Sequence, residues 1–122
     1  MKLKTIYLKA DSPFSSVLGE WADKQGIATL EYDFKSVELE PDGLLLINQN
    51  QDIEREMDEV HTDFDKKHMP TQKIDINGTL QVAVSNFEMW LSNFKCQKIL
   101  VLGSENLVKN DNLDRFLQRI QK

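Results

Sequence analysis

Apolar residues along this chain form short uninterrupted runs and longer helical stripes, and the two patterns alternate. The clearest runs are residues 44–47 (LLLI) and 99–102 (ILVL). Pro41, Asp42 and Gly43 precede the first run, and Gly103 follows the second. Apolar runs of this length between turn residues are typical of strands that are buried on both faces of a parallel sheet. The pattern therefore predicts two central strands.

Three more segments alternate between apolar and polar residues, and each predicts a strand: residues 4–10, 28–34 and 73–77. One face of residues 28–34 is charged, which indicates a half-exposed edge strand. No helical pattern separates this segment from Gly43, although parallel neighbours normally need a crossover of about a dozen residues. We therefore keep three alternatives open: an antiparallel edge strand, an unusually short crossover, or a hairpin of residues 36–40 with residues 44–48.

Four stripes of apolar residues at helical spacing predict helices. The first follows Ser12 and Pro13, a favourable N-cap and first helical residue, and stops at Gly26. The second spans about residues 51–67 and the third about residues 79–94. The fourth is capped by Asn110 or Asp111 and buries four apolar residues: Leu113, Phe116, Leu117 and Ile120.

This order of elements predicts one doubly wound α/β domain over residues 1–122, a three-layer sandwich with about five mostly parallel strands and four helices. A length of 122 residues suits a single core. A flavodoxin-like strand order would bury residues 73–77 in the middle of the sheet. A Rossmann-like order would put them at an edge and place residues 99–102 beside the first strand. The charges of Lys73 and Asp75 favour the second order.

The net charge is −5 and the isoelectric point is about 5.0, and both argue against nucleic acid and anionic membrane surfaces as partners. The chain has one cysteine, Cys96, and its first residues contain no long apolar segment. A cytoplasmic protein is therefore expected. Cys96 precedes an apolar strand and has no histidine neighbour in the sequence that would activate it, so we expect a buried, inert thiol.

Polar residues collect where the predicted strands end, which is where open α/β sheets bind ligands. These candidate ligand residues are Asp11, Ser12, Asn48, Gln49, Asn50, Asn77, Gly78, Thr79, Gly103, Ser104 and Glu105. Helix N-termini there could offer backbone donors to a nucleotide or another anion. The same residue types also serve as helix caps and turns, and no Walker loop or G-x-G-x-x-G motif is present.

Metal chemistry and catalysis find little support in the sequence. Asp58, His61 and Asp65 share one helix face, a spacing that more often marks a solvated acidic surface than a metal site. We expect no metal site and no cofactor. A hydrolase or transferase that uses Asp11 or Glu105 is the weakest hypothesis, because neither acid has a recognisable partner.

Met89 and Trp90 broaden the apolar surface of the third helix beyond a single stripe. They are candidates for a contact with a protein partner or a second copy of the chain in a homodimer. The sequence therefore favours a non-catalytic interaction or regulatory module. The alternative is a small-ligand binding protein that uses the loops at the carboxyl ends of the strands.

Overall fold

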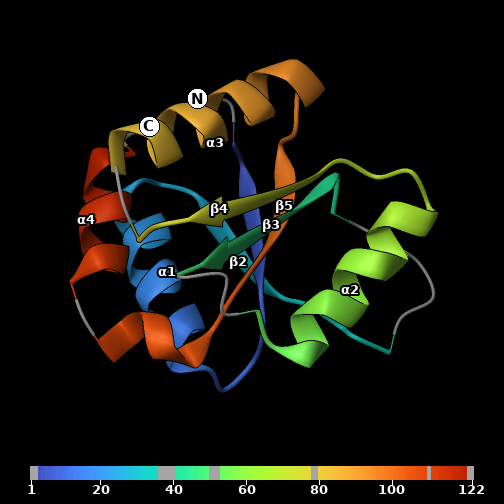
Figure 1. The fold of residues 1–122 in the computed structure, drawn as a ribbon, viewed down its shortest axis with the longest axis horizontal. Coiled ribbons are helices and arrows are strands. Elements are labelled where there is room, and N and C mark those ends of the chain that lie inside the picture. The colour runs from blue at the N-terminus through green and yellow to red at the C-terminus, as the bar shows by residue number, and fades with distance from the viewer. Residues whose placement is uncertain (1–2, 36–40, 50–52, 78–79, 110, 121–122) are drawn as a thin grey trace.

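The computed structural model describes residues 3–35, 41–49, 53–77, 80–109 and 111–120 (Figure 1). Its strands are β1 (Thr5–Leu8), β2 (Ala28–Glu31), β3 (Gly43–Asn48), β4 (Thr71–Asp75) and β5 (Lys98–Gly103). Its helices are α1 (Pro13–Lys24), α2 (Arg55–Lys66), α3 (Leu80–Phe94) and α4 (Asn112–Arg119), and a 3₁₀ helix, η1 (Glu105–Lys109), precedes α4. The second helix begins at Arg55, later than the residue 51 predicted from the sequence. The predicted cap Asn110 lies outside the described residues, and Asp111 is the N-cap of α4.

The five strands form one sheet in the order β2-β1-β5-β3-β4, and every pair is parallel. The doubly wound α/β prediction is confirmed. So is the Rossmann-like arrangement, because β4 lies at an edge and β5 pairs with β1. The antiparallel alternative for β2 was wrong: Thr5 pairs with Ala28 and Leu8 with Glu31 in parallel register. Residues 36–40 of the alternative hairpin lie outside the described residues, and β3 pairs with β5 and β4.

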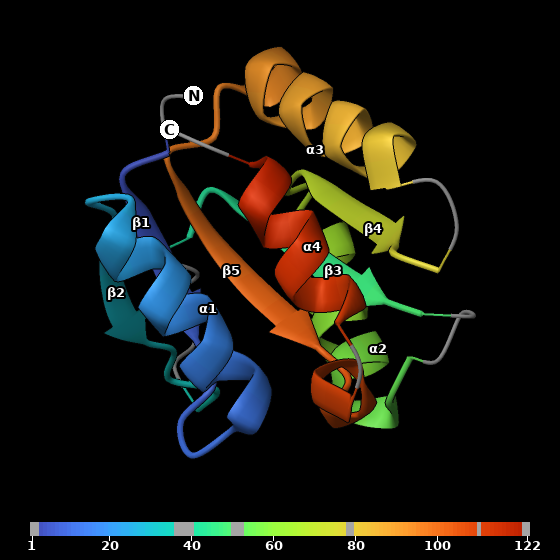
Figure 2. The same cartoon turned by 90° about the vertical axis from the view of Figure 1, so that its left-hand side faces the viewer.

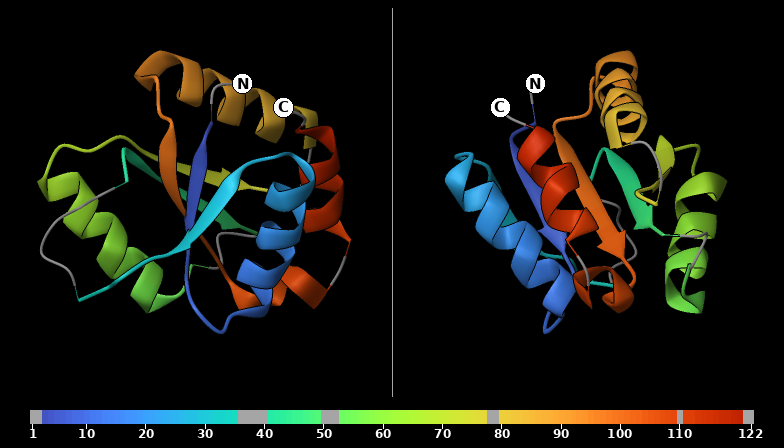
Figure 3. Two further views of the ribbon diagram at one scale, coloured as in Figure 1. Left: turned by 180° about the vertical axis from the view of Figure 1, so that it is seen from behind. Right: turned by 60° about the vertical axis from the view of Figure 1, so that its left-hand side comes forward.

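Three helices cover one face of the sheet and one helix covers the other (Figures 2 and 3). Alternation along β3 explains both cores: Leu45 and Ile47 pack with residues of α1, α3 and α4, whereas Leu44 and Leu46 pack with residues of α2. All six residues of β3 are buried, as expected for a strand covered on both faces. The continuous apolar run in the sequence therefore follows from the position of β3 inside the sheet.

A short segment covers the part of the second face that α2 does not reach. Tyr32 follows β2, and its backbone N–H donates to the carbonyl of Leu8 at 2.9 Å. Its ring lies edge-on to Tyr7, with 6.4 Å between ring centroids, and edge-on to Phe34 at 4.8 Å. Among residues 32–35, aromatic packing rather than a helix thus covers this part of the sheet.

Trp90 belongs to the core, where its ring lies beside Gly43 and Cys96, and only 4% of its surface is exposed. The hypothesis that Trp90 contacts a partner is therefore not supported, because its side chain is used inside the domain. Met89 remains on the surface with 60% exposure, and Val82, seven residues earlier on α3, is 55% exposed. Within the described ranges, no helix has both the length and the apolar character needed to cross a bilayer.

Candidate functional site

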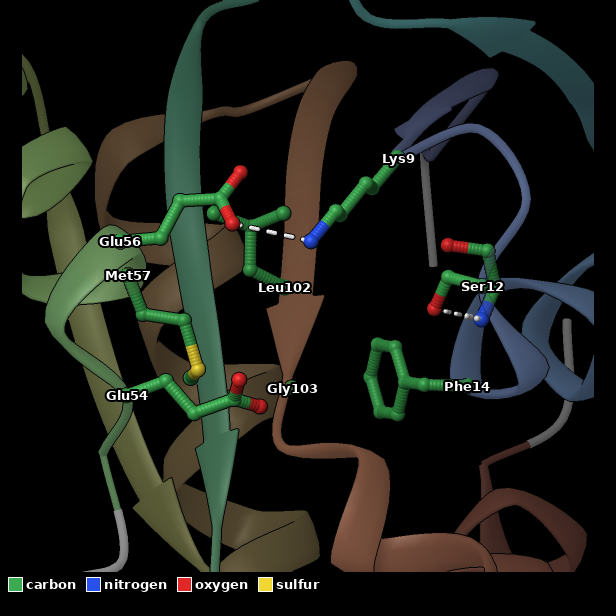
Figure 4. Close-up of a pocket in the computed structure, with 9 residues that line it drawn as sticks. Lys9, Ser12, Phe14, Glu54, Glu56, Met57, Leu102 and Gly103 are labelled. Atoms are coloured by element: carbon green, nitrogen blue, oxygen red, sulfur yellow. Dashed lines mark hydrogen bonds and ion pairs between the residues drawn. The ribbon is translucent and has the colours of Figure 1, made fainter.

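At the carboxyl edge of the sheet, the chain leaves the neighbouring strands β5 and β3 on opposite faces. β5 continues toward η1 and α4 on one face, and the adjacent β3 continues toward α2 on the other. Such a switch point is the usual ligand site of doubly wound sheets. The crevice there is lined by Lys9, Ser12, Phe14, Ser15, Glu54, Glu56, Met57, Leu102 and Gly103 (Figure 4).

This crevice is closed by the protein's own side chains. Lys9 Nζ and Glu56 Oε2 form an ion pair at 2.9 Å that joins the end of β1 to the first turn of α2 (Figure 4). The remaining cavity is about 20 Å³, which is room for about one water molecule. The crevice as it stands therefore has no room for a ligand larger than a water molecule.

Phe14 blocks the end of β5. An added β-carbon at Gly103 would lie 2.3 Å from Phe14 Cε2, so the ring packs directly on the glycine backbone. Phe14 is 1% exposed. The sequence correctly placed Gly103 at the carboxyl edge, but there its backbone contacts an aromatic ring.

The N-terminus of α1 is capped from within the chain. Glu105 Oε1 accepts a hydrogen bond from Ser12 Oγ at 2.5 Å, and Glu105 Oε2 accepts one from Phe14 N at 3.3 Å. Ser12 Oγ in turn accepts from Ser15 N at 3.2 Å. A carboxylate thus occupies the position at this helix end that an anionic ligand would take.

Acidic residues dominate the electrostatics of this edge. Glu54 Oε1 accepts from the backbone N–H of Glu105 at 3.2 Å, so α2 also holds η1. The hydrogen bond to Glu56 raises the pKa of Lys9, partial burial opposes the increase, and the charges of Glu56, Glu54 and Glu105 add to it. Lys9 is therefore a cation that nearby carboxylates already neutralise.

A second, open hollow lies between the carboxyl ends of β1 and β2 and the first turn of α1. Its volume is about 340 Å³, within the range of small-molecule sites. We call it the β1/β2 groove, and it is lined by Leu8, Lys9, Ala10, Asp11, Ser12, Ser15, Ser16, Thr29, Leu30 and Glu31. Asp11 has a φ angle of 55°, a left-handed conformation that Asp tolerates better than most residues.

Ser15 is the unusual residue of this groove. Only 8% of its surface is exposed, and Oγ has no hydrogen-bond partner among the residues that the structure describes. Ser15 lines both the crevice and the β1/β2 groove. A buried hydroxyl without a partner is costly, so it calls for a ligand or a water molecule.

The predicted site residues from β3 and β4 do not line either pocket. Asn48 is buried and its Nδ2 donates to the carbonyl of Ile74 at 3.1 Å, so the amide braces β4 against β3. Asn77 is exposed, and its backbone N–H donates to Asp75 Oδ1 at 2.8 Å.

The other predicted residues also have local roles or lie outside the described residues. Ser104 is buried, and its Oγ accepts from Asn106 N at 3.3 Å as part of a turn. Gln49 is partly buried. Asn50, Gly78 and Thr79 lie outside the described residues. The structure therefore brings together Asp11, Ser12, Gly103 and Glu105 from the predicted set, at the ends of β1 and β5.

Four charged residues of these pockets were missed as site residues in the sequence: Lys9, Glu31, Glu54 and Glu56. Lys9 could have been found, because it lies near the end of the first predicted strand, whereas Glu31 is in the middle of the predicted segment 28–34 and ends a strand only in the structure. Glu54 and Glu56 lie near the start of the predicted helix 51–67, where acidic residues favour the helix dipole whether or not they form a site. Only the tertiary fold brings this part of the chain to Lys9, which directly follows β1.

The structure clarifies two other candidates. His61 Nε2 lies 3.3 Å from Thr71 Oγ1, and this contact ties α2 to β4. No group of potential metal ligands was found in the described part of the chain. Cys96 is buried, and burial raises the pKa of its thiol to about 11, so the thiol is protonated near neutral pH.

No family model matches the sequence, and no curated protein matches it. Among solved structures, the chain is similar to a proposed molybdenum carrier protein from Syntrophus aciditrophicus SB. The TM-score is 0.73 and the sequence identity is 11%, and the match covers 95% of this chain and 91% of the other. At this identity the likeness establishes a shared fold.

Proposed function

We propose that this protein binds a small molecule in the β1/β2 groove. The observation that carries the proposal concerns Ser15, a residue of the groove lining whose buried hydroxyl has no described partner. A ligand hydrogen bond would satisfy it. Hydroxyl groups of Ser12, Ser16 and Thr29 belong to the same lining and could add polar contacts.

Two further features support this proposal. The groove lies at the carboxyl edge of a parallel sheet, beside the switch-point crevice with which it shares Lys9, Ser12 and Ser15. The structurally similar protein is described as a carrier of molybdenum, which is also a small-ligand role. Catalysis is less well supported, because Glu105 is already committed to capping α1 and Asp11 is an exposed loop residue.

The test is a thermal-shift screen followed by calorimetric titration. The screen would contain sugars, nucleosides, their phosphates and tetrahedral oxyanions including molybdate. A ligand at about a hundred times its dissociation constant should stabilise the fold by about 2.7 kcal/mol. Ser15→Ala should weaken binding about tenfold, whereas Ser85→Ala, at an exposed serine of α3, should leave it unchanged. Equal affinities of both variants and the wild type would reject the groove as the site.

A second candidate function is an interaction module, and the exposed side chains of α3 favour it. Val82 and Met89 are more than half exposed and lie about two helical turns apart, so they share one face. Light scattering on the pure protein tests this idea. If the chain is a dimer through this face, Met89→Lys should dissociate it, and Thr62→Lys, at an exposed position of α2, should not. If the protein is a monomer at all concentrations, the homodimer hypothesis is wrong, and this face could contact only a different protein.

A further inference from the structure

We infer that the β1/β2 groove selects an uncharged, hydroxyl-rich ligand, and that Glu105 excludes the phosphorylated forms of the same molecule. This inference rests on the proposed function and names the ligand class for that groove. It changes the expectation from the sequence, which was an anion at the helix N-termini. Three observations support it: the state of the α1 N-terminus, the charge around the groove, and the available hydrogen-bonding groups.

The backbone donors at the start of α1 are already used. Pro13 has no N–H, and the N–H of Phe14 donates to Glu105. The N–H of Ser15 donates to Ser12 Oγ, and that of Ser16 donates to the Ser12 carbonyl at 3.0 Å. An incoming phosphate would therefore have to displace the Glu105 carboxylate before it could bind this helix end.

Displacing Glu105 is difficult because it is held at two points. Its carboxylate accepts from Ser12 and Phe14, while its backbone N–H donates to Glu54. Glu105 is also the first residue of η1, which packs against α1. The carboxylate is thus fixed at the α1 N-terminus, in contact with Ser12 of the groove lining, and its charge repels an anion there.

Charge around the two pockets is unfavourable for an anion. One lysine, Lys9, lies among five carboxylates, those of Asp11, Glu31, Glu54, Glu56 and Glu105. Lys9 is already paired with Glu56 at 2.9 Å. A phosphate group would therefore meet net negative charge, whereas an uncharged molecule would not.

The groove suits a ligand that donates several hydrogen bonds. Ionised Asp11 and Glu31 accept hydrogen bonds only, so they match ligand hydroxyl groups. Glu31 pairs with Leu8 and is the last residue of β2, on the sheet face that carries α1. The buried Ser15 hydroxyl can both donate and accept. A sugar or the ribose of a nucleoside carries adjacent hydroxyl groups that could use all three.

The experiment compares pairs of probes that differ by one phosphate: adenosine with AMP, and glucose with glucose 6-phosphate. Calorimetric titration of the intact protein should show that, in a pair that binds, the unphosphorylated probe has an affinity at least about tenfold higher than the phosphorylated one. This factor is equivalent to 1.4 kcal/mol. Glu105→Gln keeps the size of the side chain and removes its charge, so it should reduce this preference by at least about threefold. Glu88→Gln, at an exposed position of α3, is the matched control and should keep the preference.

A second measurement needs no variant. Raising the salt concentration from 0.05 to 0.5 M should screen the repulsion between the phosphate group and the carboxylates. The difference in affinity between the two probes of a pair should then become smaller. Tighter binding of the phosphorylated member, or a preference that neither salt nor Glu105→Gln changes, would overturn the ligand class and leave the proposed groove intact. If no member of any pair and no other probe binds, both the ligand class and the proposed function are wrong.

Discussion

The ring of Phe14 occupies the space that a side chain at Gly103 would need. Phe14 Cε2 lies 2.3 Å from an ideal β-carbon on Gly103, and Cζ lies at 2.5 Å. Phe14 is in the first turn of α1 and Gly103 ends β5, so this contact fixes the helix against the carboxyl edge of the sheet. The glycine is required for packing, because any β-carbon would push the buried ring out of place.

Gly103→Ala should therefore lower the free energy of unfolding by about 1–3 kcal/mol, the usual cost of overpacking a core. Urea denaturation followed by circular dichroism measures it. Gly19→Ala is the matched control: it lies inside α1, where an added β-carbon would meet only Leu8 Cδ1 at 3.9 Å. It should stabilise the protein by about 0.5–1 kcal/mol, because alanine favours a helix. Equal effects of the two substitutions would contradict the proposed role of Gly103.

Asn48 should prove important for stability. Asn48→Ala removes the hydrogen bond to the Ile74 carbonyl and should reduce the free energy of unfolding by about 1–2 kcal/mol. Asn86→Ala, at an exposed position of α3, should change it by less than about 0.5 kcal/mol. Chemical denaturation gives both values. If Asn48→Ala is instead as stable as the wild type but no longer binds a ligand, Asn48 belongs to the binding site.

Lys95 adopts a left-handed conformation with a φ angle of 53°, directly after α3. Glycine is favoured at this position after a helix, because its backbone adopts positive φ without steric cost. Lys95→Gly should raise the free energy of unfolding by about 0.5–1 kcal/mol. Lys24→Gly, inside the last turn of α1, should lower it by a similar amount. Thermal unfolding of both variants would show shifts in opposite directions, and a destabilised Lys95→Gly would contradict the assigned conformation.

Cys96 should make the free energy of unfolding depend on pH in the alkaline range. Burial raises the pKa of its thiol from 9.0 to about 11, and the charge of Asp42 adds to the increase. The unfolded chain then loses the thiol proton at lower pH than the folded chain does. The contribution of this thiol to the free energy of unfolding is therefore fully present below about pH 9 and is lost as the pH rises toward 11.

Urea midpoints measured from pH 8 to pH 11 test this dependence. Cys96→Ala should show a flatter decline than the wild type, although its stability at pH 8 should be lower because the side chain is buried. Lys9 and Tyr32, whose pKa values are also raised, are present in both proteins and cancel in the comparison. Parallel curves would show that the thiol titrates alike in both states.

The periodicity of the sequence was sufficient to predict the strands, the helices and the fold class. The unbroken run at residues 44–47 indicated a strand buried on both faces, and β3 is such a strand. The charges of Lys73 and Asp75 correctly favoured an edge position for β4. The direction of β2 could not be predicted, because alternation along a strand is the same in parallel and antiparallel pairs.

The site was only partly predictable, for a physical reason. Local sequence determines caps and turns, so Ser12 was correctly recognised as the N-cap of α1. Contacts between residues far apart in the chain depend on strand order. Insertion of β5 between β1 and β3 brings Glu105 to Ser12, 93 residues away, and lets Lys9 reach Glu56 across the edge. The sequence by itself determined where strands end in polar residues, whereas the tertiary structure decided which of those ends meet and that acidic side chains fill the position of an anion.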